Sequence, residues 1–127
     1  MTNSENESRL KEIAIEDFIW VIYLGIILFS FISNDYEKKY ILYKNEEDKK
    51  KYREIIIVIF SILVIVYGYF LIDAYNGVKS LKQNDTDKKK LLVTLSFFAS
   101  FLIFISGIIF LYIAYKDENL DVELAFN

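Results

Sequence analysis

The chain contains no cysteine, no histidine and no proline, and only four of its 127 residues are glycine. Without cysteine it forms neither a disulfide nor a thiolate metal site, and without histidine it lacks the usual general base and the commonest metal ligand. The absence of proline removes the usual sign of the broken helices found at transporter sites. No glycine-rich phosphate loop, paired carboxylates or metal-binding spacing is present. These absences predict a protein that is not an enzyme and holds no cofactor or metal.

Apolar and charged residues are segregated into blocks along the chain. Hydrophobic residues make up 54% of the sequence and charged residues 26%. Such segregation is typical of membrane proteins, and it leaves no stretch large enough for a separate soluble core. We therefore expect a single membrane domain whose principal partner is the lipid bilayer. The basic residues lie in short clusters beside the apolar runs, a placement that suits lipid headgroups rather than nucleic acid.

Three apolar runs predict three membrane-spanning helices. The run at residues 18–33 is about 24 Å long as a helix, which is shorter than a hydrocarbon core of about 30 Å unless flanking residues help it to cross. The other two runs are long enough on their own. Because an open sheet edge is not tolerated in lipid, helices are the only viable structure. The predicted fold is thus an all-α integral membrane protein with transmembrane helices at residues 13–34, 55–76 and 91–115.

We expect a different structure for each of the segments outside the spans. Residues 1–12 form a polar N-terminus, of which 1–8 should be disordered. Residues 35–54 are basic and carry tyrosines at helical spacing, so we expect an amphipathic interfacial helix with the tyrosines at headgroup depth and the lysines turned to phosphate, a plain charged loop being the alternative. In the loop at residues 77–90, Gly77 should provide a left-handed C-cap and residues 84–87 an N-cap, so that the second and third helices form a hairpin. The acidic tail, residues 116–127, either docks or remains loose.

Orientation is not decided by the charges. With three spans, the N-terminus and the second loop share one side and carry two and five Lys or Arg residues, while the first loop and the tail carry seven and one. Seven against eight gives no bias under the positive-inside rule. Three interpretations stay open. The preference of the first segment can dominate, which places the N-terminus outside and the tail inside; the first segment can lie in the interface and leave a two-span hairpin; or the protein can insert in both orientations, as small dual-topology proteins do.

Small residues recur at sevenfold spacing in the second and third runs. In lipid, faces of small residues let helices approach closely and hold a bundle together. Because three helices bury little by themselves, we expect a homo-oligomer or a larger membrane protein as partner. The candidate helix-packing residues are Ser61, Gly68, Ser96, Ser100, Gly107 and Ala114.

Charged residues near the span ends are candidates for other roles. Asp73 lies about 27 Å along the second helix from Ile55, at the far headgroup boundary, so an ion pair with a loop lysine is favoured over a place in an ion pathway. The lysines of both connections are candidates for contacts with lipid headgroups. These candidates are Lys38, Lys39, Lys49, Lys50, Lys51, Lys88, Lys89 and Lys90.

Two functional hypotheses follow. The first is a multi-pass protein, in the cell membrane, with a non-enzymatic accessory, regulatory or immunity-type role that acts through helix contacts. The second is a pore-forming or small transporter oligomer in which Ser96, Ser100 and Gly107 line the path and Asp73 lies at its mouth. For the second hypothesis, the size and the three spans resemble phage holins, although holin tails are typically basic and this tail is acidic.

Overall fold

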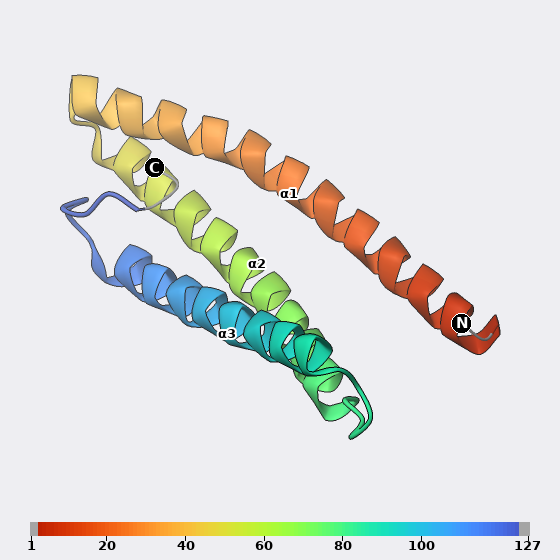
Figure 1. Ribbon diagram of the computed structural model, residues 1–127. Coiled ribbons are helices and arrows are strands. Elements are labelled where there is room, and N and C mark those ends of the chain that lie inside the picture. The colour runs from red at the N-terminus through yellow and green to blue at the C-terminus, as the bar shows by residue number, and fades with distance from the viewer. Residues whose placement is uncertain (1–2, 125–127) are drawn as a thin grey trace. The chain divides into compact units, whose positions relative to one another are not determined.

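Three long helices make up the computed structural model, which describes residues 3–124 (Figure 1). Helix α1 spans Asn3–Tyr43, α2 spans Glu46–Lys79 and α3 spans Asp87–Lys116. All three are long and apolar enough to cross a membrane. No strand occurs among the described residues. The prediction of an all-α chain with three apolar helices is therefore confirmed.

Helix α1 is longer than the sequence predicted. Its 41 residues extend for about 62 Å, because no proline interrupts the backbone hydrogen bonds. Near its start, Arg9 forms salt bridges with Glu12 at 3.1 Å and with Glu16 at 3.3 Å, which link successive turns. The prediction of a disordered start was wrong for residues 3–8, which are helical; residues 1–2 lie outside the described part of the chain.

A break at Lys44 and Asn45 separates α1 from α2. Lys44 has a φ of 54°, in the left-handed region, and its N–H donates to the carbonyl of Tyr40 at 2.7 Å. The side-chain oxygen of Asn45 accepts from the N–H of Glu47 at 2.9 Å and so caps the start of α2. The predicted interfacial segment is therefore divided between the last turns of α1 and the first turns of α2, and residues 3–124 contain no separate helix of that kind.

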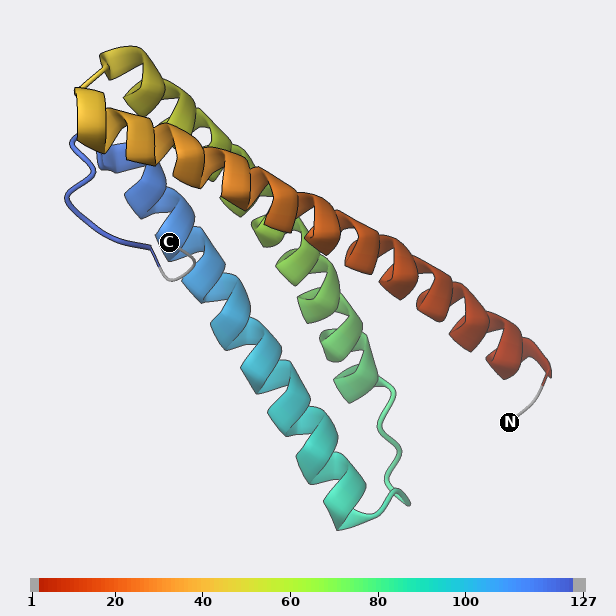
Figure 2. The same ribbon diagram turned by 90° about the horizontal axis from the view of Figure 1, so that it is seen from above.

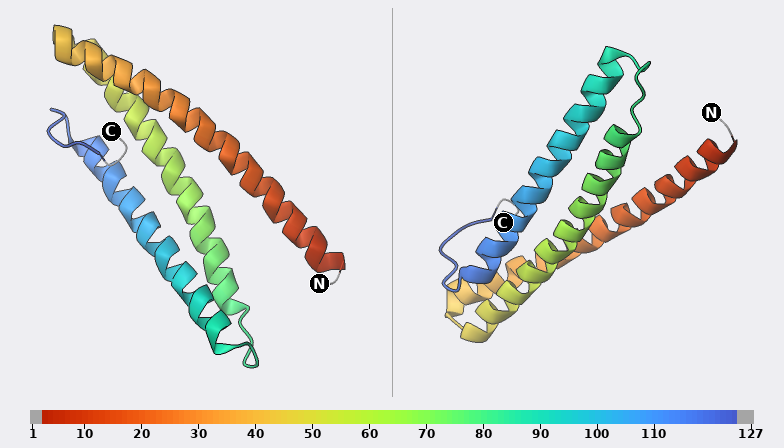
Figure 3. Two further views of the ribbon diagram at one scale, coloured as in Figure 1. Left: turned by 45° about the horizontal axis from the view of Figure 1, so that its top comes forward. Right: turned by 90° about the horizontal axis from the view of Figure 1, so that it is seen from below.

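The chain divides into two compact units. The first, Met1–Tyr52, contains α1 and the opening turns of α2, and the second, Arg53–Asn127, contains the rest of α2, α3 and the tail. In the second unit α2 and α3 lie side by side and antiparallel, joined by a short loop (Figures 2 and 3). The predicted hairpin of the second and third helices is confirmed.

The hairpin loop differs from the prediction at one end and agrees at the other. Helix α2 continues past Gly77 to Lys79, and Gly77 does not have a positive φ. Its assignment as a left-handed C-cap was therefore wrong. The N-cap of α3 is Thr86, inside the predicted residues 84–87, and its hydroxyl accepts from the N–H of Lys89 at 3.1 Å.

Candidate functional site

Among the three glycines of the second unit, Gly107 has the least space for a side chain. A Cβ atom built on Gly107 would lie 3.0 Å from Cδ2 of Tyr67 and 3.4 Å from Cγ2 of Val64, so the ring of Tyr67 occupies the space that a side chain would need. Gly107 itself is buried. A bulky tyrosine on α2 thus packs against a position without a side chain on α3.

The same complementarity recurs along the hairpin. A Cβ atom on Gly68 of α2 would lie 3.4 Å from the ring of Phe104 of α3. Here the glycine belongs to α2 and the aromatic residue to α3, the reverse of the contact between Tyr67 and Gly107. Phe60 and Phe110 contact each other with ring centroids 5.7 Å apart, and Phe60 is only 1% exposed. We call these contacts the hairpin face, made of Phe60, Val64, Tyr67 and Gly68 of α2 with Phe104, Gly107 and Phe110 of α3.

The predicted packing residues have different places relative to this face. Gly68 and Gly107 lie in it. Ala114 is buried, whereas Ser61 and Ser100 are half-buried, and the Ser61 hydroxyl donates to the carbonyl of Ile57 at 2.7 Å. Ser96 is exposed. The small residues therefore do not act as one uniform stripe.

Sequence reasoning missed the aromatic partners of the glycines. Tyr67 and Phe104 lie beside the two glycines, and Phe60 and Phe110 make a further ring contact between α2 and α3. A weak signal was present, since Phe60 and Tyr67 are seven residues apart, as are Gly68 and Ser61 beside them. Aromatic residues are so frequent in these runs, however, that spacing alone could not separate packed rings from lipid-facing rings.

A second group of hydrogen bonds lies at the end of the hairpin opposite the loop. The Arg53 guanidinium donates from Nη2 to the carbonyl of Tyr115 at 3.0 Å, joining α2 to the last turn of α3. Just beyond α3, the Asp117 carboxylate accepts from the N–H groups of Asp121 and Val122, both at 2.9 Å. These backbone donors, with a smaller contribution from the charge of Arg53, lower the pKa of Asp117. The described part of the acidic tail is thus folded back rather than loose.

In the first unit, lysines gather around two tyrosines. Tyr36 lies beneath the ammonium groups of Lys39 and Lys51 at 5.5 and 5.6 Å from the ring centroid. Tyr40 is contacted in the same way by two further lysines, from the helix break and from the first turns of α2. Cation–π attraction thus draws the charged ends of Lys39, Lys49 and Lys51 over these rings. That these lysines contact lipid headgroups stays a prediction.

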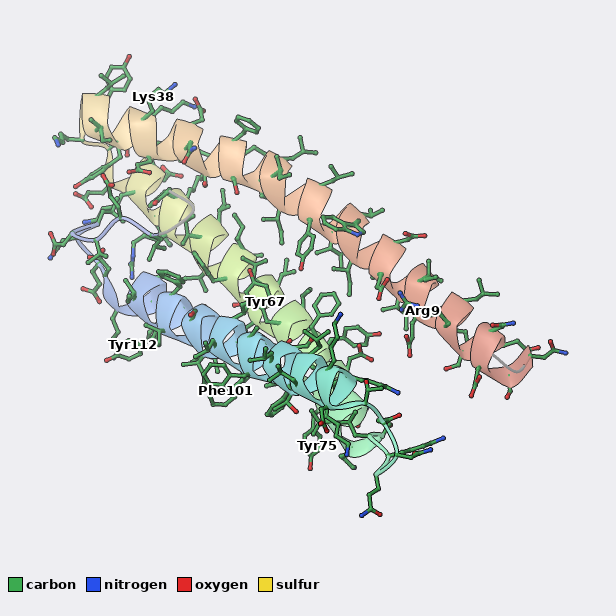
Figure 4. All side chains as sticks on the ribbon, in the orientation of Figure 1. Arg9, Lys38, Tyr67, Tyr75, Phe101 and Tyr112 are labelled. Atoms are coloured by element: carbon green, nitrogen blue, oxygen red, sulfur yellow. The ribbon has the colours of Figure 1, made fainter. Side chains whose placement is uncertain are left out.

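Several of these lysines also pair with carboxylates. Lys39 lies 3.2 Å from Asp35, Lys49 lies 3.9 Å from Glu46, and Lys51 lies 3.8 Å from Glu47. The Asp35 carboxylate raises the pKa of Lys39 through its hydrogen bond and its charge. Lys38 and Lys50 make no such contact with a described residue. Figure 4 shows Lys38 projecting from the last turns of α1.

The hairpin loop holds the remaining candidate lysines. The Asp85 carboxylate accepts from the backbone N–H of Lys82 at 2.7 Å and from Nζ of Lys89 at 3.2 Å. These contacts lower the pKa of Asp85, the backbone hydrogen bond contributing most. Nζ of Lys90 donates to the carbonyl of Gln83 at 3.0 Å, and Lys88 makes no ion pair with a described residue. The loop is therefore a structured turn held by its own side chains.

Asp73 is the remaining candidate residue, and the acidic side chains together are the remaining candidates for a metal site. Asp73 is exposed and lies six residues before the end of α2, close to the loop rather than at the middle of the helix. Within residues 3–124, no group of three Asp or Glu side chains is arranged to hold a metal ion. What the described geometry supports is helix packing and surface charge.

Comparison with known proteins assigns neither a family nor a function to the chain. No protein-family model matches the chain, no curated protein is detectably similar to it, and no solved structure matches it. The function is therefore inferred from the residues and contacts described above.

Proposed function

We propose that the chain is a multi-pass membrane protein that crosses the bilayer three times and acts, without catalysis, as an accessory, regulatory or immunity-type partner of other membrane proteins. The observation that carries this proposal is the apolar surface left over after folding. Only 6% of the most apolar window of α1 and 11% of that of α3 is buried, against 28% for α2. Apolar surface of this extent is unstable in water, and lipid or partner helices would cover it.

The hairpin face leaves other helix faces available for a partner. Figure 4 shows Phe101 and Tyr112 projecting from α3 away from α2, and their exposed fractions are 43% and 62%. On α1, a Cβ atom at Gly25 would have no described atom within 4 Å. An open glycine in an apolar helix is a place where a second helix can approach closely. A second copy of the chain or a larger membrane protein would fit there.

Packing at Gly107 favours this interaction role over a pore. The pore hypothesis needs Ser96, Ser100 and Gly107 to face water, but Tyr67 and Val64 cover Gly107. A dye-release assay separates the two roles. We expect vesicles containing the protein to retain a small dye as well as protein-free vesicles do, whereas release comparable with that of a known channel would favour the pore.

Single-cysteine labelling tests the three spans, because the chain offers a cysteine-free background. Cysteines replace Ser4, Asn45, Asn84 and Asn119, all exposed positions. A membrane-impermeant maleimide added to intact cells should label either the cysteines at positions 4 and 84 or those at positions 45 and 119, but not both pairs. Equal labelling of all four sites in intact cells would contradict a single three-span topology.

A pair of glycine variants tests the partner surface. Gly25→Leu should change the crosslinked species in the membrane while leaving the hairpin intact, because nothing in the described chain fills that space. Gly107→Leu is the matched control, since it should disturb the hairpin through Tyr67 instead. If the crosslinked species are unchanged in Gly25→Leu, the face of α1 around Gly25 does not contact a partner.

A further inference from the structure

Of the two connections between the apolar runs, the hairpin connection, taken as the loop with the adjoining ends of α2 and α3, has the larger net positive charge. Residues 79–90 contain five lysines and two aspartates, a net charge of +3. Residues 35–54, the other basic connection, contain seven basic and six acidic residues, a net charge of +1. The N-terminal turns and the tail are both acidic. The loop is therefore the one connection whose charge is clearly complementary to an anionic surface.

The loop presents its lysines from a fixed backbone. Asp85 holds the turn through the N–H of Lys82 and Nζ of Lys89, and Thr86 caps α3. Nζ of Lys79 lies 5.3 Å from the ring centroid of Tyr75, which in turn contacts Phe97 of α3 at 5.8 Å. The backbone that carries Lys82 and Lys88 therefore needs little further ordering when these residues bind a ligand.

Exposed aliphatic side chains flank these lysines on both helices. Ile72 of α2 is 63% exposed, and three leucines in the first turns of α3 are exposed by half or more. These leucines are Leu91, Leu92 and Leu95. Lysines next to lipid-facing aliphatic residues reproduce the two parts of a phospholipid, a charged headgroup and an acyl chain. Figure 4 shows Tyr75 at the end of the hairpin where this loop lies.

We propose that the α2–α3 loop is a docking surface for anionic phospholipids, with Lys82 and Lys88 contacting the phosphate and the aliphatic residues of both helices contacting the acyl chains. This inference rests on the proposed membrane insertion. An acidic protein segment would match the charge but not the lipid-facing aliphatic residues beside it, and so a lipid is the better occupant.

The probe is spin-labelled phosphatidylglycerol, compared with spin-labelled phosphatidylcholine in phosphatidylcholine vesicles that contain the full chain. The motionally restricted fraction of each lipid measures its association with the protein. We expect a severalfold preference for phosphatidylglycerol. The double variant Lys82→Gln, Lys88→Gln should remove most of that preference, since each lysine near an anionic surface contributes up to about fivefold.

The matched control is Lys38→Gln, Lys50→Gln. It removes the same charge from the other connection, again at lysines without an ion pair to a described residue, and it should keep the preference. Equal loss in both double variants, or no preference in the wild type, would overturn the proposed surface. Cysteine labelling of the same samples separates the two proposals: an inserted protein without lipid preference overturns only this inference, and a protein that does not insert overturns the proposed function.

Discussion

The ring of Tyr67 in α2 fills the space above Gly107 in α3, where an added Cβ atom would lie only 3.0 Å from Cδ2 of that ring. We therefore expect Gly107→Leu to destabilise the hairpin by about 1–3 kcal/mol, the usual cost of forcing extra atoms into a packed contact. Unfolding in mixed detergent micelles, followed by circular dichroism, measures the change.

Other glycines of the chain supply controls for this prediction. Gly25→Leu adds the same side chain to a helix where no described atom lies within 4 Å, so it should have little effect on that transition. Gly68→Leu should be intermediate, because its neighbour at 3.4 Å is the movable ring of Phe104. An equal loss of stability in all three variants would mean that leucine acts through the helix backbone and not through the hairpin face.

The sequence predicted the helices and the hairpin because both follow from local signals. Long apolar runs in a chain without proline leave helices as the only option in lipid, and the turn residues before α3 include its N-cap, Thr86. Spacing also identified Gly68 and Gly107, since a small residue every seven positions keeps one helix face aligned. It could not identify their partners, because which aromatic ring fills which gap depends on the register between α2 and α3.

Helix ends were predicted less well, for a physical reason. Polar residues at 3–12, 35–43 and 46–54 were assigned to non-spanning segments because they do not belong in lipid, yet nothing in them breaks a helix. Ion pairs such as Arg9 with Glu12 support helical turns outside an apolar run. The C-cap at Gly77 failed in the same way, because glycine permits a left-handed residue but does not require one.

The N-cap of α3 provides a test of the loop. Thr86→Ala removes the hydroxyl that accepts from the N–H of Lys89 at 3.1 Å, and it should destabilise the start of α3 by about 1 kcal/mol. Hydrogen exchange of the amides of residues 88–90 should become faster. Thr94→Ala, at an exposed position within α3, is the control and should leave these amides unchanged. Unchanged exchange in Thr86→Ala would show that the cap contributes nothing measurable.

At the opposite end of the hairpin, Arg53→Gln should loosen the last turn of α3. The substitution removes the hydrogen bond from Nη2 to the carbonyl of Tyr115, and for a partly exposed contact we expect a loss of about 1 kcal/mol. Faster hydrogen exchange at Asp117, whose N–H donates to Ile113, would report it. Lys50→Gln removes a charge without removing a described contact and should have no effect. If both variants behave alike, net charge and not the hydrogen bond is responsible.

The proposed lipid docking surface also predicts an orientation. The count of Lys and Arg favours neither side, but anionic lipids are concentrated in the cytoplasmic leaflet. If residues 79–90 dock on such lipids, they should lie on that side together with the N-terminus. In intact cells, a cysteine at Asn45 or Asn119 should then react with an impermeant maleimide, while one at Asn84 should react only after permeabilisation. The reverse pattern would place the connection at residues 35–54 in the cytoplasm and would contradict the prediction.

Folding of the tail should depend on pH through Asp117. Hydrogen bonds from the N–H groups of Asp121 and Val122 lower the pKa of its carboxyl when the tail is folded, so the charged form is favoured by folding. The stabilisation is therefore complete above the ordinary aspartate value of about 3.8 and is lost as pH falls through the lowered pKa. Amide protection of residues 121 and 122 should fall at acidic pH in the wild type. In Asp117→Asn, which keeps one acceptor oxygen but cannot ionise, protection should be weaker at neutral pH and independent of pH in the acidic range. A pH dependence that persists in this variant would show that Asp117 is not the group responsible.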